Sequence, residues 1–134
     1  MTAKPTVGAY MARRLTTLSP DTEINRAVAV LLDNDISGAP VVDDTGRLVG
    51  MLSMRDCLQA ALKDAYHQEW GGTVADYMSA EVETLDADLD IVGAAEKFVA
   101  SRYRRFPVLI HGRLAGQISR TDVLRALNQL WSGR

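Results

Sequence analysis

Apolar residues recur at helical spacing in two stretches of the chain. In each stretch they fall at i, i+3, i+4, i+7 and i+8, which places them on one face of a helix. The first stripe is Ile24, Ala27, Val28, Leu31 and Leu32, and the second is Ile91, Ala94, Ala95, Phe98 and Val99. Helix-start residues precede both stripes, at Ser19-Pro20-Asp21 and at Asp86–Asp88. We therefore predict two amphipathic helices.

Each stripe is followed by a pattern typical of two strands and a second helix. The segments read PVVDDTGRLVGMLS, with a turn at Asp43–Gly46, and PVLIHGRLAGQIS, with a turn at His111-Gly112. Closing helices are expected to start near Ser53 and near Ser119. With a short strand before each stripe, every unit reads strand-helix-strand-strand-helix, so the predicted fold class is mixed α/β (α+β).

The two similar patterns are copies of one repeat. A shift of about 67 positions aligns VGAYM, which starts at Val7, with VADYM, which starts at Val74. We predict repeat 1 at 7–66, a linker at 67–73 and repeat 2 at 74–131. A unit of about 60 residues buries only a small core, so we expect the repeats to pack pseudo-symmetrically through their sheets.

Composition narrows the class of protein. The 134 residues include 15 Lys and Arg against 17 Asp and Glu, for a net charge of −2, and 47% are apolar, as in globular domains. No apolar run reaches the roughly 18–20 residues that span a bilayer, and the N-terminus lacks the apolar region of a secretory signal. The single cysteine, Cys57, excludes an internal disulfide. We expect a cytoplasmic location, no membrane contact and no metal site.

The repeat motifs resemble those of the CBS domain, and the tandem resembles a CBS pair, or Bateman module. The shared features are a short strand with Thr, the amphipathic helix, the hydrophobic-Pro-Val step at Pro40 and Pro107, and a Gly-hydrophobic-hydrophobic-Ser-x-x-Asp motif. The resemblance implies clefts between the repeats that bind AMP, ADP or ATP, or else S-adenosylmethionine or NAD. It also implies homodimers that regulate a separate effector protein. It covers the chain from Val7 to Leu130, so no catalytic domain is expected on either side.

The strongest candidate site is Gly50-Met51-Leu52-Ser53-Met54-Arg55-Asp56, which returns as Gly116-Gln117-Ile118-Ser119-Arg120-Thr121-Asp122. A strand that ends at a helix N-terminus exposes unpaired N–H groups that suit a phosphate or a ribose hydroxyl. We expect the leading glycine to let a ligand approach the backbone and each aspartate to accept hydrogen bonds from ribose hydroxyls. Because Ser-x-x-Asp is also a capping-box helix start, a purely structural role stays open. The candidates here are Met51, Ser53, Arg55, Asp56, Ser119, Arg120, Thr121 and Asp122.

The residues before each proline are the second set of candidates. The resemblance implies that they face the ligand phosphate: Ser37 and Gly38 in one cleft, Arg104 and Arg105 in the other. Guanidinium groups match phosphate oxygens, so we expect two clefts of different charge. We expect the charged cleft to join the two arginines to the Ser53–Asp56 motif. The alternative for the arginines is a solvated basic loop.

Three further candidates come from the resemblance and from position. Thr17 and Thr84 occupy matching places at the start of each repeat, near the base or phosphate, with ordinary β-propensity as the alternative. Pro107 belongs to the hydrophobic-Pro-Val step that follows the two arginines.

The less charged cleft, with Ser37 and the Ser119–Asp122 motif, is expected to take ligands with fewer phosphates or to stay empty.

The charge distribution disfavours nucleic-acid binding, and the side-chain chemistry disfavours catalysis. Residues 67–96 hold eight acidic and no basic residues, whereas 97–134 hold eight basic residues and one acidic residue. Without interleaved aromatics or a helix-turn-helix pattern, this basic segment fits a phosphate-bearing small ligand better than a nucleic acid. His67 and His111 lack an evident nucleophile, so we expect no enzyme.

The sequence thus predicts a regulatory, energy-sensing module that binds an adenine nucleotide and signals to an effector protein. The alternative is a structural dimerisation module with vestigial clefts. Apolar positions on the last helix, such as Leu130 and Trp131, lead us to expect a homodimer.

Overall fold

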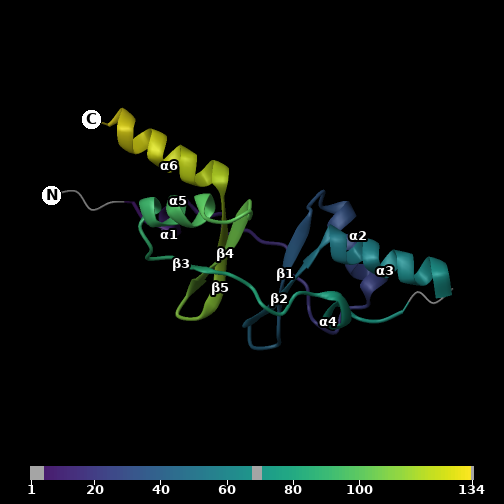
Figure 1. The fold of residues 1–134 in the computed structure, drawn as a ribbon. Coiled ribbons are helices and arrows are strands. Elements are labelled where there is room, and N and C mark those ends of the chain that lie inside the picture. The colour runs from purple at the N-terminus through teal and green to yellow at the C-terminus, as the bar shows by residue number, and fades with distance from the viewer. Residues whose placement is uncertain (1–4, 68–70, 134) are drawn as a thin grey trace. The chain divides into compact units, whose positions relative to one another are not determined.

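The computed structural model of the chain describes residues 5–67 and 71–133. They form two compact units (Figure 1). Unit 1 comprises Met1–Leu15 and Glu83–Arg134, and unit 2 comprises Thr16–Val82. Each unit combines helices with a small sheet, which confirms the mixed fold class. The predicted linker at 67–73 includes residues 68–70, which lie outside the described residues, and the predicted packing of the repeats through their sheets stays a prediction.

Unit 2 is built on one hairpin and three helices. Strands β1 (Gly38–Val42) and β2 (Leu48–Ser53) pair antiparallel. The helices are α2 (Ile24–Asp33), α3 (Met54–His67) and the single turn α4 (Val74–Tyr77). The buried cluster that joins them contains Leu18, Ile24, Ala27, Leu31, Ala39, Val41, Leu52, Cys57, Ala60 and Val74.

Unit 1 repeats this plan with one more strand. Its sheet has the order β3-β4-β5, in which β3 (Leu85–Asp86) runs parallel to β4 (Arg105–Ile110), and β4 runs antiparallel to β5 (Arg113–Ser119). The helices are α1 (Val7–Tyr10), α5 (Ile91–Val99) and α6 (Arg120–Ser132). The rings of Phe98 and Phe106 meet in the core at a centroid distance of 4.7 Å.

Both predicted apolar stripes form helices, and most of their residues face the core. Ile24, Ala27 and Leu31 are buried, as are their counterparts in α5. The last residue of each stripe is an exception: Leu32 is 61% and Val99 is 88% exposed. Position i+8 lies about 80° around the helix from position i, so it reaches the edge of the buried face.

The predicted helix starts were wrong in both repeats. Helix α2 begins after Glu23, and Ser19-Pro20-Asp21 lies in the turn before it. Helix α5 begins after Asp90, whose side chain accepts a hydrogen bond of 2.9 Å from the Gly93 N–H. Asp86 instead ends β3.

The opening strand predicted for repeat 1 is reduced to a single parallel bridge between Leu18 and Val41. In repeat 2 the Ala87 N–H continues the pairing by donating to Leu109 O at 3.0 Å. The aligned residue in repeat 1 is Pro20, which has no N–H and cannot extend a ladder. One proline therefore explains why only repeat 2 has a β3 strand.

The opening segment of each repeat packs in the compact unit of the other repeat (Figure 1). Helix α1 is tied to the α5 side of unit 1, where Val7 N donates to Leu89 O at 2.8 Å. Helix α4 is tied to unit 2, where Val74 N donates to Thr22 O at 2.8 Å. Both Val7 and Val74 are fully buried. Each repeat therefore completes its core with a segment from the other.

Candidate functional site

In unit 2, the junction between β2 and α3 is a capping box. Asp56 Oδ2 accepts hydrogen bonds from the Ser53 N–H and from the Ser53 hydroxyl, both at 2.9 Å. The Asp56 N–H donates back to Ser53 Oγ at 3.1 Å. Asp56 Oδ1 takes no hydrogen bond from any described residue. The pair therefore caps the helix with one carboxylate oxygen and leaves the other available to an incoming donor.

Unit 1 repeats the capping box at the junction between β5 and α6. The Ser119 N–H donates to Asp122 Oδ2 at 2.9 Å, and the Asp122 N–H donates to Ser119 Oγ at 3.2 Å. Here the second oxygen is engaged, because Arg125 Nη1 lies 3.1 Å from Asp122 Oδ1. The Arg125 side chain is 56% exposed and the Asp122 side chain 19%, so a ligand that binds this oxygen would have to replace a half-buried ion pair. Sequence reasoning missed Arg125, although its i, i+3 spacing from Asp122 was the available signal.

The residues before each proline lie beside the helix start of their own unit. Ser37 O accepts a hydrogen bond of 2.8 Å from the Met54 N–H, and Arg104 O accepts one of 3.1 Å from the Arg120 N–H. One residue further on, Gly38 pairs with Ser53 and Arg105 pairs with Ser119 across the hairpins. The two helix-start motifs thus each sit next to the segment that leads into the proline strand.

The two sites differ in charge within their units. Unit 1 brings Arg104 and Arg105 together with Ser119 and Asp122, and both arginines are exposed. Among the described residues, no side-chain or backbone acceptor engages either guanidinium group. Unit 2 has no basic residue at the matching positions Ser37 and Gly38. The expected link between Asp56 and the two arginines would join residues of different units, and it stays a prediction.

The remaining candidates surround these motifs to different degrees. Thr84 is half-buried directly before β3, whereas Thr17 is exposed beside the Leu18 bridge. Arg55 and Thr121 are exposed in the first turns of α3 and α6. Met51 is half-buried in β2, opposite Pro40 in the hairpin, and Pro107 is buried in β4.

The glycines at the start of the motifs serve a different purpose from the one we expected. A Cβ on Gly50 would lie 2.6 Å from Met78 Sδ and 2.9 Å from Ser79 O. A Cβ on Gly116 would lie 2.6 Å from Met11 Sδ and 2.7 Å from Ala12 O. The expectation that a ligand approaches the backbone here was wrong, because the opening segment of the other repeat fills the space.

Cys57 follows Asp56 and faces the core of unit 2. It is 8% exposed, and burial raises the pKa of its thiol, with the neighbouring Asp56 carboxylate raising it further. A thiol held in its protonated form is a poor nucleophile. Within the described ranges, no cluster of three or more His, Cys, Asp or Glu residues could hold a metal ion. Nor is any described helix long and apolar enough to cross a membrane.

The chain belongs to the CBS domain family, because the family model matches it twice, at residues 7–63 and 74–129. Two CBS domains in tandem confirm the resemblance inferred from the motifs.

Among curated proteins, the chain is 29% identical to protein MJ1225 of Methanocaldococcus jannaschii over 94% of its own length and 44% of that protein. It is 28% identical to the chloroplastic CBS domain-containing protein CBSX1 of Arabidopsis thaliana, over 93% of its own length and 65% of that protein. The chain thus spans less than two thirds of each of these relatives.

Among solved structures, the chain resembles CBSX2 of Arabidopsis thaliana in complex with AMP. The TM-score is 0.80 and the identity 28%, over 95% of this chain and 98% of that one. The fold of the whole tandem is therefore that of a CBS pair.

Proposed function

We propose that this CBS pair is a regulatory module that binds an adenosine-containing nucleotide of the AMP, ADP or ATP class at its helix-start motifs. The observation that carries the proposal is the placement of Arg104 and Arg105 beside Ser119 and Asp122 within unit 1. The backbones of two exposed arginines, which have no side-chain partner among the described residues, thus lie beside a helix start that carries a carboxylate. The likeness to CBSX2, whose structure was solved with AMP, supports the same ligand class.

Each group has a distinct part in binding. In unit 1 we propose that Asp122, in place of the Asp56 that the sequence led us to expect, accepts hydrogen bonds from the ribose hydroxyls. Ser119 and the N-terminus of α6 are proposed to lie against the sugar or phosphate, and the two arginines to bind the phosphates. Thr84 and Thr121 border this site. A nucleotide with more phosphate charge gains more from the two guanidinium groups than adenosine does.

The site of unit 2 is proposed to be the less charged of the two. Asp56 offers a ribose its Oδ1, which takes no hydrogen bond within the described ranges, with Ser53 and Ser37 close by. Because positions 37 and 38 are serine and glycine rather than arginine, this site is proposed to select adenosine and AMP over ATP. Met51 and Arg55 belong to the same motif, and Thr17 is proposed to border it.

Signalling follows from differential binding: the ligand favours one arrangement of the module over another, and a separate effector protein reads that arrangement. We also propose that the module is a homodimer. Exposed aliphatic side chains sit at equivalent positions of the closing helices, with Leu58 on α3 and Leu124 on α6 each 64% exposed. Exposed apolar faces of this kind mark association surfaces.

A structural dimerisation module with vestigial sites is the second candidate. It is favoured by the two complete Ser-Asp capping boxes, since these explain both motifs without any ligand. Thermal denaturation with AMP, ADP, ATP, S-adenosylmethionine and NAD separates the two functions. A sensor gains about 2.7 kcal/mol of stability at 100 times the dissociation constant. An unchanged melting temperature with every ligand at millimolar concentration would exclude the sensor and leave the structural module.

A further inference from the structure

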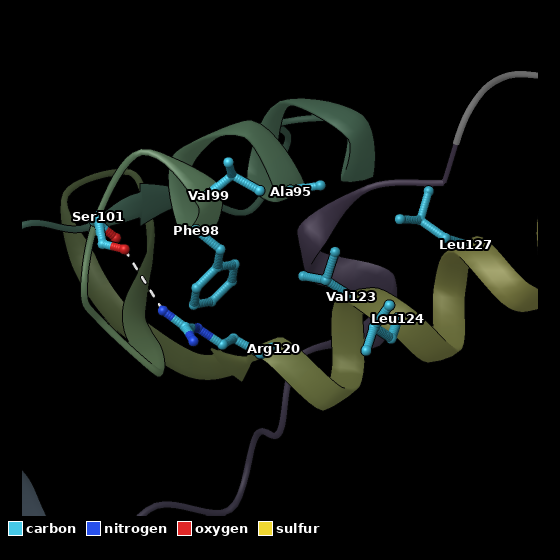
Figure 2. Close-up of a pocket in the computed structure, with 8 residues that line it drawn as sticks. All are labelled: Ala95, Phe98, Val99, Ser101, Arg120, Val123, Leu124 and Leu127. Atoms are coloured by element: carbon cyan, nitrogen blue, oxygen red, sulfur yellow. Dashed lines mark hydrogen bonds between the residues drawn. The ribbon is translucent and has the colours of Figure 1, made fainter.

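The side chain of Arg120 is directed at the backbone of the loop before β4. Its Nε donates a hydrogen bond of 2.9 Å to Tyr103 O, and its Nη2 lies 3.5 Å from Ser101 O. Figure 2 shows the guanidinium turned toward Ser101 and away from Leu124 and Leu127. The sequence placed Arg120 among the ligand contacts, and that role stays a prediction; here two of its five N–H donors are directed at main-chain carbonyls.

The exposed side chain of Arg120 also borders an apolar groove. It lines a groove of about 450 Å³ between α5 and α6, together with Phe98, Val123 and Leu124 (Figure 2). The planar guanidinium fork is pre-organised, so a head that already donates to two carbonyls has little further rotamer freedom. Arg120 is therefore well placed to act as a fixed clamp.

The clamped loop carries the two arginines of the proposed phosphate site. The Arg120 N–H also donates to Arg104 O at 3.1 Å, so one residue holds both Tyr103 and Arg104 through their carbonyls. The same loop is also held through a side chain, because the Tyr103 ring packs on the Phe106 ring at a centroid distance of 5.3 Å. These contacts fix the backbone from which the Arg104 and Arg105 side chains extend.

Repeat 1 lacks this clamp. Met54 stands at the position of Arg120 and makes the equivalent backbone bond, in which its N–H donates to Ser37 O at 2.8 Å. A thioether has no donor with which to hold the preceding carbonyls. The clamp thus occurs where the loop carries two arginines and is absent where it carries Ser37 and Gly38.

We propose that Arg120 is a positioning residue that sets the phosphate preference of the unit 1 site. This inference rests on the proposed function and explains how the unit 1 site selects among adenosine ligands. Holding the loop in one conformation before binding lowers the entropy lost when Arg104 and Arg105 meet a phosphate. Adenosine makes no use of these arginines and does not benefit from the clamp.

The test compares Arg120→Met, which copies repeat 1, with Arg102→Met, which removes one charge from the same loop. Arg102 is exposed and has no hydrogen-bond or ion-pair partner in the described part of the chain. We expect Arg120→Met to lower the ratio of ATP to adenosine affinity by about fivefold, the effect of one net hydrogen bond on an equilibrium. Arg102→Met should leave the ratio within about twofold, as loss of a screened surface charge does. Isothermal titration calorimetry measures both affinities.

Hydrogen exchange on the ligand-free protein provides the second readout. Amides of residues 102–105 should exchange faster in Arg120→Met than in Arg102→Met or the wild type, at unchanged melting temperature. Arg120→Lys keeps the charge but lacks the planar fork, so its affinity ratio should fall below that of the wild type.

Three results would overturn the inference. The first is that Arg120→Met keeps the wild-type ratio of ATP to adenosine affinity. The second is that both methionine variants lower this ratio equally. The third is that Arg120→Lys keeps the full wild-type ratio, which would indicate direct contact of the side chain with phosphate. A wild-type protein that binds no nucleotide would instead refute the proposed function itself, and the inference with it.

Discussion

Ala12 and Gln117 exchange two backbone hydrogen bonds, of 2.8 and 2.9 Å, that attach the opening segment of repeat 1 to strand β5 of repeat 2. Ser79 and Met51 exchange the equivalent pair, both at 2.9 Å, between the opening segment of repeat 2 and strand β2. In both strands a glycine directly precedes, in sequence, the residue that makes these two hydrogen bonds: Gly116 precedes Gln117, and Gly50 precedes Met51. The absence of a side chain there allows the two backbones to meet.

We predict that Gly116→Ala destabilises the protein. The new Cβ would lie 2.7 Å from the Ala12 carbonyl oxygen, and backbone cannot move aside as a flexible side chain can. Overpacking of this kind costs about 1–3 kcal/mol, which urea denaturation would detect.

Gly71→Ala is the matched control, because no atom of the described residues lies within 4 Å of a Cβ at that position. It should change the free energy of unfolding by less than about 0.5 kcal/mol, as for other surface substitutions. Equal stability of the two variants would contradict the packing role assigned to Gly116.

The sequence predicts the repeated elements well because local periodicity determines them. It could not predict that the opening segments are exchanged, since VGAYM and VADYM are so similar that neither carries information about which repeat it packs against. Nor could it locate the start of α5. Asp86, Asp88 and Asp90 are all good capping residues, and only the pairing of Asp86 with Leu109 in the sheet removes the first of them.

In the candidate site, too, the sequence predicts the local contacts but not the tertiary ones. The Ser-x-x-Asp motif predicts the local hydrogen bonds of both capping boxes, because its members are three residues apart. The sequence does not show that Arg120 turns toward Tyr103, because an arginine at a helix start can face solvent, ligand or protein. Tertiary contact with the 101–104 loop decides its direction.

We predict that Asp122→Asn weakens ATP binding about tenfold, as loss of a hydrogen bond to a charged group does. The amide oxygen still accepts the Ser119 N–H, so the cost in stability should stay below about 1 kcal/mol. Asp56→Asn, the matched variant in unit 2, should leave ATP binding nearly unchanged and weaken AMP binding at the other site. Calorimetric loss of ATP affinity in Asp56→Asn alone would instead favour the link between Asp56 and the two arginines.

The Cys57 thiol should make stability fall at alkaline pH. Burial, together with the Asp56 carboxylate, raises its pKa in the folded state, so the unfolded chain releases this proton at lower pH than the folded one does. The contribution is fully present below the ordinary pKa of a thiol and is lost as pH rises through the folded value. Cys57→Ala should therefore lose less stability than the wild type between about pH 7 and pH 10. Parallel pH profiles of the two proteins would contradict this.

We predict a homodimer that depends on the exposed apolar faces of the closing helices. Leu58→Glu places a charge on such a face of α3 and should give a monomer in light scattering at micromolar concentration. Gln59→Glu adds the same charge one residue away on an already exposed polar position and should remain dimeric. A monomeric wild-type protein, or a dimeric Leu58→Glu, would refute the assignment.

Nucleotide binding at the helix-start motifs can be observed residue by residue in an NMR titration of the ¹⁵N-labelled chain with AMP and with ATP. If nucleotide binds at the helix-start motifs, amide shifts will concentrate on Ser119–Asp122 and Ser53–Asp56, and ATP will add Arg104 and Arg105. We expect saturable shifts at these amides and none for guanosine at the same concentration. Saturable shifts confined to other surfaces, or no shifts with either nucleotide, would contradict it.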